Sequence, residues 1–182
     1  MAYLIVLAGL IGAGKSTVVK KIMDKFDALV LNTDEIRGLN KNMKMPKDGY
    51  KADEETMKIR QETYDIMFKR AKDGLHKGKV VVLDGTFERK RWRESAKLVA
   101  EKMHVPCYII EVVCEDEKEL AKRVELRSIM NREVPPPIVA KQQREHYEKI
   151  AETEKIYTIY TGIKKDLDSQ VEEVSNIIRG VQ

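Results

Sequence analysis

Residues Gly9–Ser16 read G-L-I-G-A-G-K-S, and they follow the apolar run Tyr3–Ala8 and precede a segment with helical spacing. The three glycines of this stretch allow backbone N–H groups to turn inward around a phosphate chain, at the positive end of the following helix. A lysine and a serine at the end of the stretch are the side chains that reach the β/γ-phosphates and ligate Mg²⁺. The stretch therefore predicts a nucleoside triphosphate site.

ATP and Mg²⁺ are the cofactors that this loop predicts. Lys15 is the expected ligand of the phosphates, and Ser16 is the expected ligand of the metal. The predicted nucleotide-binding residues of the loop and the first helical turn are Gly9, Gly12, Ala13, Gly14, Lys15, Ser16 and Thr17.

The composition indicates one domain over residues 1–182, because 182 residues with 42% hydrophobic content suffice for one well-buried core. Apolar runs stay well below the roughly 20 residues that cross a bilayer, so we expect no membrane segment and a cytoplasmic location. Cys107 and Cys114 are expected to be reduced thiols. A net charge of +4 is far weaker than the basic excess of a dedicated duplex-binding protein. The oligomeric state is left open.

Apolar runs alternate with segments of helical spacing along the whole chain, which predicts a parallel sheet covered by helices on both faces. The four runs after the first are Ala28–Leu31, Lys79–Leu83, Cys107–Val113 and Ile156–Tyr160. Helices are expected over residues 52–75, 89–102, 116–130, 138–154 and 168–179. The segment Lys41–Tyr50 is expected to be a loop at the substrate mouth.

The cluster T-D-E-I-R follows the second strand, at the edge of the sheet where ligands bind. Asp34 has the chemistry to accept the proton of an attacking hydroxyl, and Arg37 has the chemistry to clamp a phosphate or carboxylate. The ordinary alternative makes Thr33 or Asp34 a helix N-cap and Arg37 a surface charge. Spacing alone leaves both interpretations open.

Asp84 ends the third strand, where phosphate-loop proteins keep an aspartate near Mg²⁺. The arginines that follow it, Arg89, Arg91 and Arg93, are expected to face either phosphates or water. Trp92 is expected to be packed in the core rather than stacked on a base.

A basic segment precedes the helix-breaking triplet Pro135-Pro136-Pro137. Arg123 and Arg127 are four residues apart and share a helical face, and Arg132 follows them. Such arginines, delivered by a mobile lid over residues 123–137, stabilise the charge that develops on a transferred phosphoryl group. A solvated helix face is the alternative.

Together, the stretches G-L-I-G-A-G-K-S, T-D-E-I-R, V-V-V-L-D-G-T and K-R-V-E-L-R before N-R-E-V-P resemble the kinase domain of polynucleotide 5′-hydroxyl kinases. The wider group of P-loop kinases that shares these features includes zeta-toxin-like kinases, seryl-tRNA kinases and small-metabolite kinases. The resemblance covers about residues 1–150. It implies a P-loop NTPase fold, a three-layer α/β sandwich with a five-stranded parallel sheet and an arginine-bearing lid.

The resemblance also implies roles for individual residues. Lys15 and Ser16 look like the phosphate and Mg²⁺ ligands, and Asp34 looks like the general base for the acceptor hydroxyl. Arg37 resembles the arginine that holds a phosphate beside that hydroxyl. Asp84 is similar to the acid that supports the metal, so Ser16 and Asp84 form the expected metal site. The lid arginines Arg123 and Arg127 complete the catalytic set, with Arg132 on the nucleotide.

The leading hypothesis is an ATP- and Mg²⁺-dependent kinase that moves the γ-phosphoryl group to a hydroxyl, with the 5′-hydroxyl of a single-stranded nucleic acid end as the favoured acceptor. A small-metabolite or nucleotide kinase is the first rival. A nucleotide-dependent switch or accessory ATPase is a rival of another class, although a switch needs a positioned water rather than the aspartate and arginine that follow the second strand.

Overall fold

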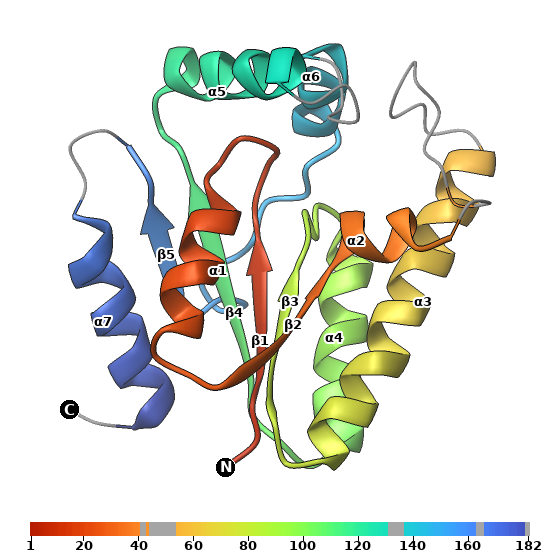
Figure 1. Ribbon diagram of the computed structural model, residues 1–182, viewed down its shortest axis with the longest axis vertical. Helices are drawn as coiled ribbons and strands as arrows, with labels where there is room; N and C mark the ends of the chain where they lie inside the picture. The colour runs from red at the N-terminus through yellow and green to blue at the C-terminus, as the bar shows by residue number, and fades with distance from the viewer. Residues whose placement is uncertain (41–42, 44–53, 131–136, 163–165, 181–182) are drawn as a thin grey trace.

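The computed structural model describes residues 1–40, 43, 54–130, 137–162 and 166–180 (Figure 1). Within these residues, five parallel strands form one sheet in the order β2-β3-β1-β4-β5. The strands are β1 (Leu4–Ala8), β2 (Ala28–Asn32), β3 (Val80–Asp84), β4 (Cys107–Val113) and β5 (Tyr157–Tyr160). Each predicted strand is confirmed to within one residue at either end.

Helices cover both faces of the sheet, so the predicted three layers are confirmed (Figure 1). On one face lie α3 (Glu54–His76) and α4 (Lys90–Lys102). On the other face lie α1 (Lys15–Met23) and α7 (Leu167–Arg179).

The central strand β1 is buried on both sides, which explains why its sequence is apolar without interruption. Leu4, Val6 and Ala8 belong to the cluster packed against α3 and α4. Ile5 and Leu7 point the other way, into the cluster packed against α1 and α7. Packing on both faces therefore holds β1 in place, and the phosphate loop begins where this strand ends.

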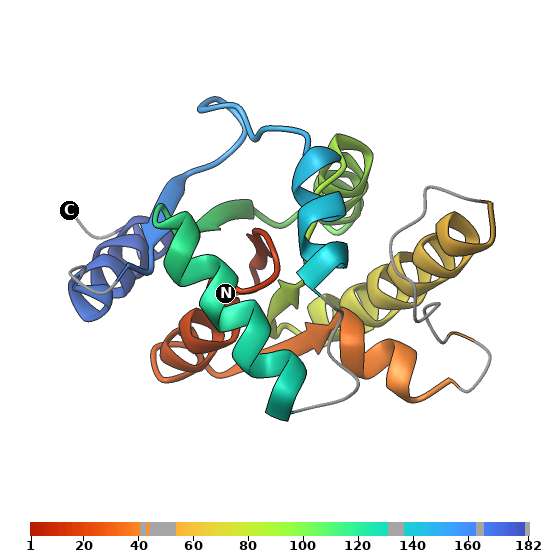
Figure 2. The same ribbon diagram turned by 90° about the horizontal axis from the view of Figure 1, so that it is seen from above.

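Three further helices lie beyond the carboxyl ends of the strands, around the edge where the loop opens (Figure 1). They are α2 (Thr33–Gly38), α5 (Glu117–Met130) and α6 (Pro137–Glu145). Viewed onto that edge, α5 crosses close to the loop (Figure 2). A Cβ built on Gly12 would lie 2.9 Å from Val124 and 3.1 Å from Leu120 of α5, so this helix packs directly on the loop.

The helix expected over residues 138–154 is wrong beyond Glu145, where α6 ends. Long-range contacts take the following residues out of helical geometry. The N–H of Glu148 donates to the Glu88 carbonyl at 2.8 Å, and the Tyr147 hydroxyl donates to Glu111 of β4 at 3.2 Å. Ile150 is fully buried against the face that α3 and α4 cover. The helical spacing of this segment reflects burial by other elements and not a helix.

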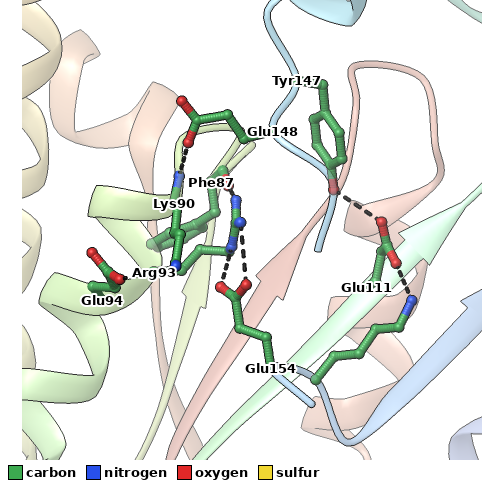
Figure 3. A network of polar contacts seen from close by, with 9 residues as sticks. Phe87, Lys90, Arg93, Glu94, Glu111, Tyr147, Glu148 and Glu154 are labelled. Atoms are coloured by element: carbon green, nitrogen blue, oxygen red, sulfur yellow. Dashed lines mark hydrogen bonds and ion pairs between the residues drawn. The ribbon is translucent and has the colours of Figure 1, made fainter. Parts of the chain in front are cut away.

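Arg93 occupies neither of the positions expected for the basic segment after β3. Its side chain is fully buried, its guanidinium binds Glu154 at 2.5 Å, and it donates to the Phe87 carbonyl at 2.9 Å (Figure 3). Arg89 pairs with Glu148 at 3.2 Å. The Arg89–Glu148 and Arg93–Glu154 ion pairs therefore anchor the segment between α6 and β5 to the start of α4.

Replacing Arg93 with methionine is expected to lower the free energy of unfolding by about 3–5 kcal/mol, because Glu154 would keep a largely buried charge without its partner. Chemical denaturation measures this loss. Lys90→Met is the control in the same helix, since the Lys90–Glu94 pair is more than half exposed and is expected to contribute less than about 1 kcal/mol. Equal losses in the two variants would contradict the assignment of Arg93 as an anchor.

Candidate active site

The phosphate loop has the geometry that its glycines predict. A Cβ on Gly9 would lie 2.3 Å from the Val112 carbonyl oxygen, so no larger residue fits there. Gly14 has a φ of 93° and precedes the first residue of α1. Ser16 and Thr17 are exposed at the start of that helix. The loop is therefore an open cradle at a helix N-terminus, the arrangement that binds phosphate through backbone N–H groups.

The ammonium group of Lys15 lies against the loop itself. Its Nζ donates to the carbonyl oxygens of Gly9 at 2.9 Å and Leu10 at 3.0 Å. An ammonium group has three hydrogens, so these two bonds hold the charge in one place at the rim of the loop. This placement suits a group that meets the β/γ-phosphates, the role that the sequence predicts for Lys15.

Asn32, the last residue of β2, links the two acidic positions that the sequence singled out. Its Oδ1 accepts from the N–H of Asp34 at 2.8 Å and of Glu35 at 3.2 Å, so Asn32 is the N-cap of α2. Its Nδ2 donates to Asp84 at 2.7 Å. The alternative interpretation, in which Thr33 or Asp34 caps the helix, is therefore wrong. The Asp34 side chain does not cap α2 and is 83% exposed.

Arg37 lies one turn after Asp34 in α2, and the guanidinium forms an ion pair with the Asp34 carboxylate. The Arg37 side chain is mostly buried, at 16% exposure, so it is not an ordinary surface charge. The structure thus brings Asp34 and Arg37 together at the edge of the sheet, and Asp34 is the more accessible of the two.

Asp84 ends β3 and is almost fully buried. Burial raises the pKa of its carboxyl above the usual value, and the Lys15 ammonium and the Asn32 amide oppose that rise. The nearby carboxylates of Asp34 and Glu35 raise the pKa further. The charges of Lys15 and of the start of α2 therefore act on the Asp84 carboxyl. Ser16 and Asp84 carry side-chain oxygen atoms, the kind of ligand that Mg²⁺ prefers beside a polyphosphate, and a metal site on them stays a prediction.

A buried ion pair near this edge was not predicted from the sequence. Arg60 of α3 pairs with Glu88, which also accepts a hydrogen bond from the Thr86 hydroxyl. The Thr86 carbonyl in turn accepts from the N–H of Gly9 at 3.1 Å, so the pair is connected to the phosphate loop. A signal existed in the sequence, because Arg60 interrupts the apolar stripe of α3 between Met57 and Tyr64.

The backbone between Thr86 and Glu88 has an unusual conformation. Phe87 has a φ of 46°, a conformation that a non-glycine residue rarely adopts. Two side chains hold it there: the Tyr64 hydroxyl accepts from the Phe87 N–H at 3.1 Å, and Arg93 donates to its carbonyl at 2.9 Å. Tyr64 also stacks on Trp92 with ring centroids 4.5 Å apart, which confirms that the tryptophan is packed in the core.

Of the three arginines predicted for the lid, the structure describes the side-chain contacts of Arg123. Arg123 of α5 donates to the Thr161 hydroxyl at 3.0 Å and carbonyl at 2.7 Å, and it pairs with Glu119 at 2.9 Å. The Thr161 hydroxyl donates to the Ala13 carbonyl at 2.6 Å, so Arg123 is linked to the phosphate loop through Thr161. Arg127 lies in α5, but its side chain is outside the described part of the structure. Arg132 lies outside the described residues altogether. So does the loop Lys41–Tyr50, with the exception of Met43.

Among the described residues, no group of three or more His, Cys, Asp or Glu side chains has the arrangement of a metal site. This finding is compatible with Mg²⁺, which usually takes only one or two protein ligands and fills its other positions with phosphates and water.

In the part of the chain that the structure describes, no helix combines the length and hydropathy needed to cross a membrane. Cys107 and Cys114 are both free, and burial raises the pKa of the Cys107 thiol to about 12.

Solved structures share this arrangement of sheet and helices at low sequence identity. Kti12 of Chaetomium thermophilum, in complex with ADP-AlF3, is 16% identical, with 98% of each chain covered and a TM-score of 0.74. A gluconokinase from Sinorhizobium meliloti 1021 is 18% identical, with 97% of this chain and 92% of that chain covered and a TM-score of 0.68. The Mycobacterium tuberculosis APS kinase CysC, in complex with AMPPNP and APS, is 18% identical, with 98% of each chain covered and a TM-score of 0.66.

Sequence comparison identifies the family of the chain. No curated protein matches the chain. A family model described as an AAA domain matches residues 4–150, which include the phosphate loop, Asp34, Asp84 and both helices α5 and α6. The chain therefore belongs to this AAA domain family, and its sheet and helices have the same arrangement as those of Kti12 and the gluconokinase.

Proposed function

We propose that the protein is an ATP- and Mg²⁺-dependent phosphotransferase that moves the γ-phosphoryl group of ATP to a hydroxyl group. The observation that carries the proposal is the link through Asn32, which binds Asp84 with one end of its amide and caps the helix of Asp34 with the other. The start of α2, which carries the exposed Asp34 carboxylate, is thereby held to Asp84 beside the phosphate loop. A protein that only hydrolyses ATP has no need for that pairing.

In this proposal, each residue has a defined task. Lys15 neutralises charge on the β/γ-phosphates, and the loop N–H groups orient them. Ser16 and Asp84 would hold Mg²⁺, which neutralises charge on the phosphate oxygens when bound. Asp34 accepts the proton of the acceptor hydroxyl, and Arg37 orients Asp34 or binds an anionic group of the acceptor.

The roles of the lid arginines are a separate part of the proposal. Arg127 and Arg132 are assigned to the transferred phosphoryl group and the nucleotide, as the sequence predicts. Arg123 is assigned to the same set, with the qualification that its contacts to Glu119 and Thr161 must open for its guanidinium to reach a phosphate.

A small hydroxyl compound is the acceptor that the observations favour. In the described residues, both arginines at the acceptor edge are paired with carboxylates, Arg37 with Asp34 and Arg60 with Glu88. A polynucleotide backbone is usually bound by a track of cations that neutralise phosphates. The gluconokinase and the APS kinase of the same fold are named for small acceptors. The nucleic acid 5′-hydroxyl, suggested by the sequence resemblance, finds no comparable support.

A nucleotide-dependent switch or accessory ATPase is the second candidate. Kti12, which is not named as a kinase, has the same fold with a TM-score of 0.74 and is the neighbour that favours it. The exposed Asp34 beside Arg37 argues for the kinase, because hydrolysis requires a positioned water rather than a base for an acceptor hydroxyl.

The acceptor class is tested with γ-labelled ATP and Mg²⁺ against separate pools of sugars and polyols, of nucleosides, and of RNA and DNA oligonucleotides with 5′-hydroxyl ends. Label in a small hydroxyl compound is the expected result. Label on an oligonucleotide end would replace the acceptor and keep the mechanism. Release of inorganic phosphate at the same rate with every pool and without any would favour the switch.

A further inference from the structure

The peptide unit between Leu10 and Ile11 in the phosphate loop is hydrogen-bonded on both sides. The Leu10 carbonyl oxygen accepts from Lys15 Nζ at 3.0 Å. The Ile11 N–H donates to Oε1 of Gln143, a residue of α6, at 3.0 Å. The bond from Ile11 to Gln143 joins residues 132 positions apart in the chain, and both bonds lie in the loop that is proposed to bind ATP.

The carbonyl and N–H of one trans peptide point in opposite directions. Lys15 and Gln143 therefore lie on opposite sides of the Leu10–Ile11 unit, with Lys15 on the side of its carbonyl and Gln143 behind it. A hydrogen bond to the N–H strengthens the carbonyl as an acceptor, since bonds in a chain polarise one another. Gln143 thus adds, from the N–H side, to the bonds that orient the carbonyl that holds the lysine.

Packing alone does not fix this part of the loop. A cavity of about 160 Å³ lies between the loop, α5 and α6, and its lining includes Leu10, Ile11, Leu120 and Val124. Hydrogen bonds therefore hold the peptide: its carbonyl accepts from the Ala13 N–H at 3.2 Å as well as from Lys15, and Gln143 is the partner of its N–H.

The burial of Gln143 is costly, which argues for a role beyond stability. The residue is 1% exposed, and its Nε2 has no hydrogen-bond partner among the described residues. A buried donor without a partner costs about 1–3 kcal/mol. An apolar side chain of similar length would avoid that cost, but it would leave the Ile11 N–H unbound.

We propose that Gln143 is a positioning residue for Lys15: through the Leu10–Ile11 peptide, it sets the place of the ammonium group that binds the nucleotide phosphates. The inference rests on the proposed nucleotide site and adds to it a residue of α6, a helix that carries none of the predicted nucleotide ligands. It also makes the strength of ATP binding depend on where α6 lies.

A double-mutant cycle with Lys15 tests this inference, with ATP binding measured by calorimetry up to millimolar concentrations. Gln143→Met is expected to weaken binding about fivefold to tenfold, the effect of one hydrogen bond. In a Lys15→Met background, the same change is expected to weaken binding less than about twofold, because the residue through which Gln143 acts is gone. Gln142→Met is the control, a glutamine at the next position of α6 with no hydrogen bond to the loop.

Each of three binding results would overturn the inference: unchanged binding in Gln143→Met, an equal loss in Gln142→Met, or an equal loss in both Lys15 backgrounds. Melting temperatures without nucleotide are expected to be similar for the two glutamine variants, so a folding defect limited to Gln143→Met also counts against it. If the unaltered protein binds no ATP, the proposed function fails and this inference fails with it. Normal binding with a neutral Gln143→Met removes only the inference.

Discussion

Replacing Asp34 with asparagine is expected to lower phosphoryl transfer about a thousandfold, within the range of about 10²–10⁴ that a general base contributes. Asparagine has nearly the same size as aspartate but does not accept the proton of the acceptor hydroxyl. Because Asn32 and not Asp34 caps α2, the substitution leaves the helix start intact. ATP binding is therefore expected to stay within about twofold, and the loss falls on kcat.

Glu35→Gln is the matched control for this substitution. Glu35 is the neighbouring exposed acid of α2 and also adds to the raised pKa of Asp84, so it shares the electrostatic environment of Asp34. The account expects transfer within a few-fold of normal in this variant. Near-normal transfer by Asp34→Asn, or an equal loss in Glu35→Gln, would remove Asp34 from the role of base.

Replacing Lys15 with methionine is expected to reduce transfer by about a hundredfold to a thousandfold, as for other donors aimed at developing charge. ATP affinity should fall as well, because Lys15 is the cation proposed to meet the β/γ-phosphates. Quenched assays with labelled ATP measure the loss of transfer, and calorimetry measures the loss of ATP affinity.

Lys20→Met controls for the loss of a positive charge from the same helix, since Lys20 is exposed on α1. This variant is expected to bind ATP and transfer phosphate normally. If Lys15→Met bound ATP as tightly as the unaltered protein, the loop would not be the phosphate site, and the contacts of Lys15 to the Gly9 and Leu10 carbonyls would be purely structural.

Regular, repeated patterns made the fold readable from the sequence. Each strand is a short apolar run, and a parallel sheet with both faces covered requires runs of that kind. The phosphate loop was equally readable, because its glycines are required by local geometry, such as the 2.3 Å approach of a Cβ on Gly9 to the Val112 carbonyl. The end of α6 was not readable, since contacts to Glu88 and Glu111, far away in the chain, determine it.

The site was predicted in its parts but not in its connections. Asp34, Arg37 and Asp84 lie together at one edge of the sheet, as the order of motifs implies. The amide of Asn32, which joins them, depends on the spacing of two neighbouring strands in three dimensions. Arg93 was expected to face either phosphates or water, but its buried partner Glu154 lies 61 residues later in the chain.

The most direct test of the account is the fate of the γ-phosphoryl group, followed by phosphorus NMR in the presence of Mg²⁺, ATP and the pool of small hydroxyl compounds. The account predicts that ATP is consumed together with the appearance of a phosphate monoester, and that consumption nearly stops without the pool. Inorganic phosphate as the sole product, formed at the same rate with and without the pool, would contradict the assignment of the protein as a phosphotransferase.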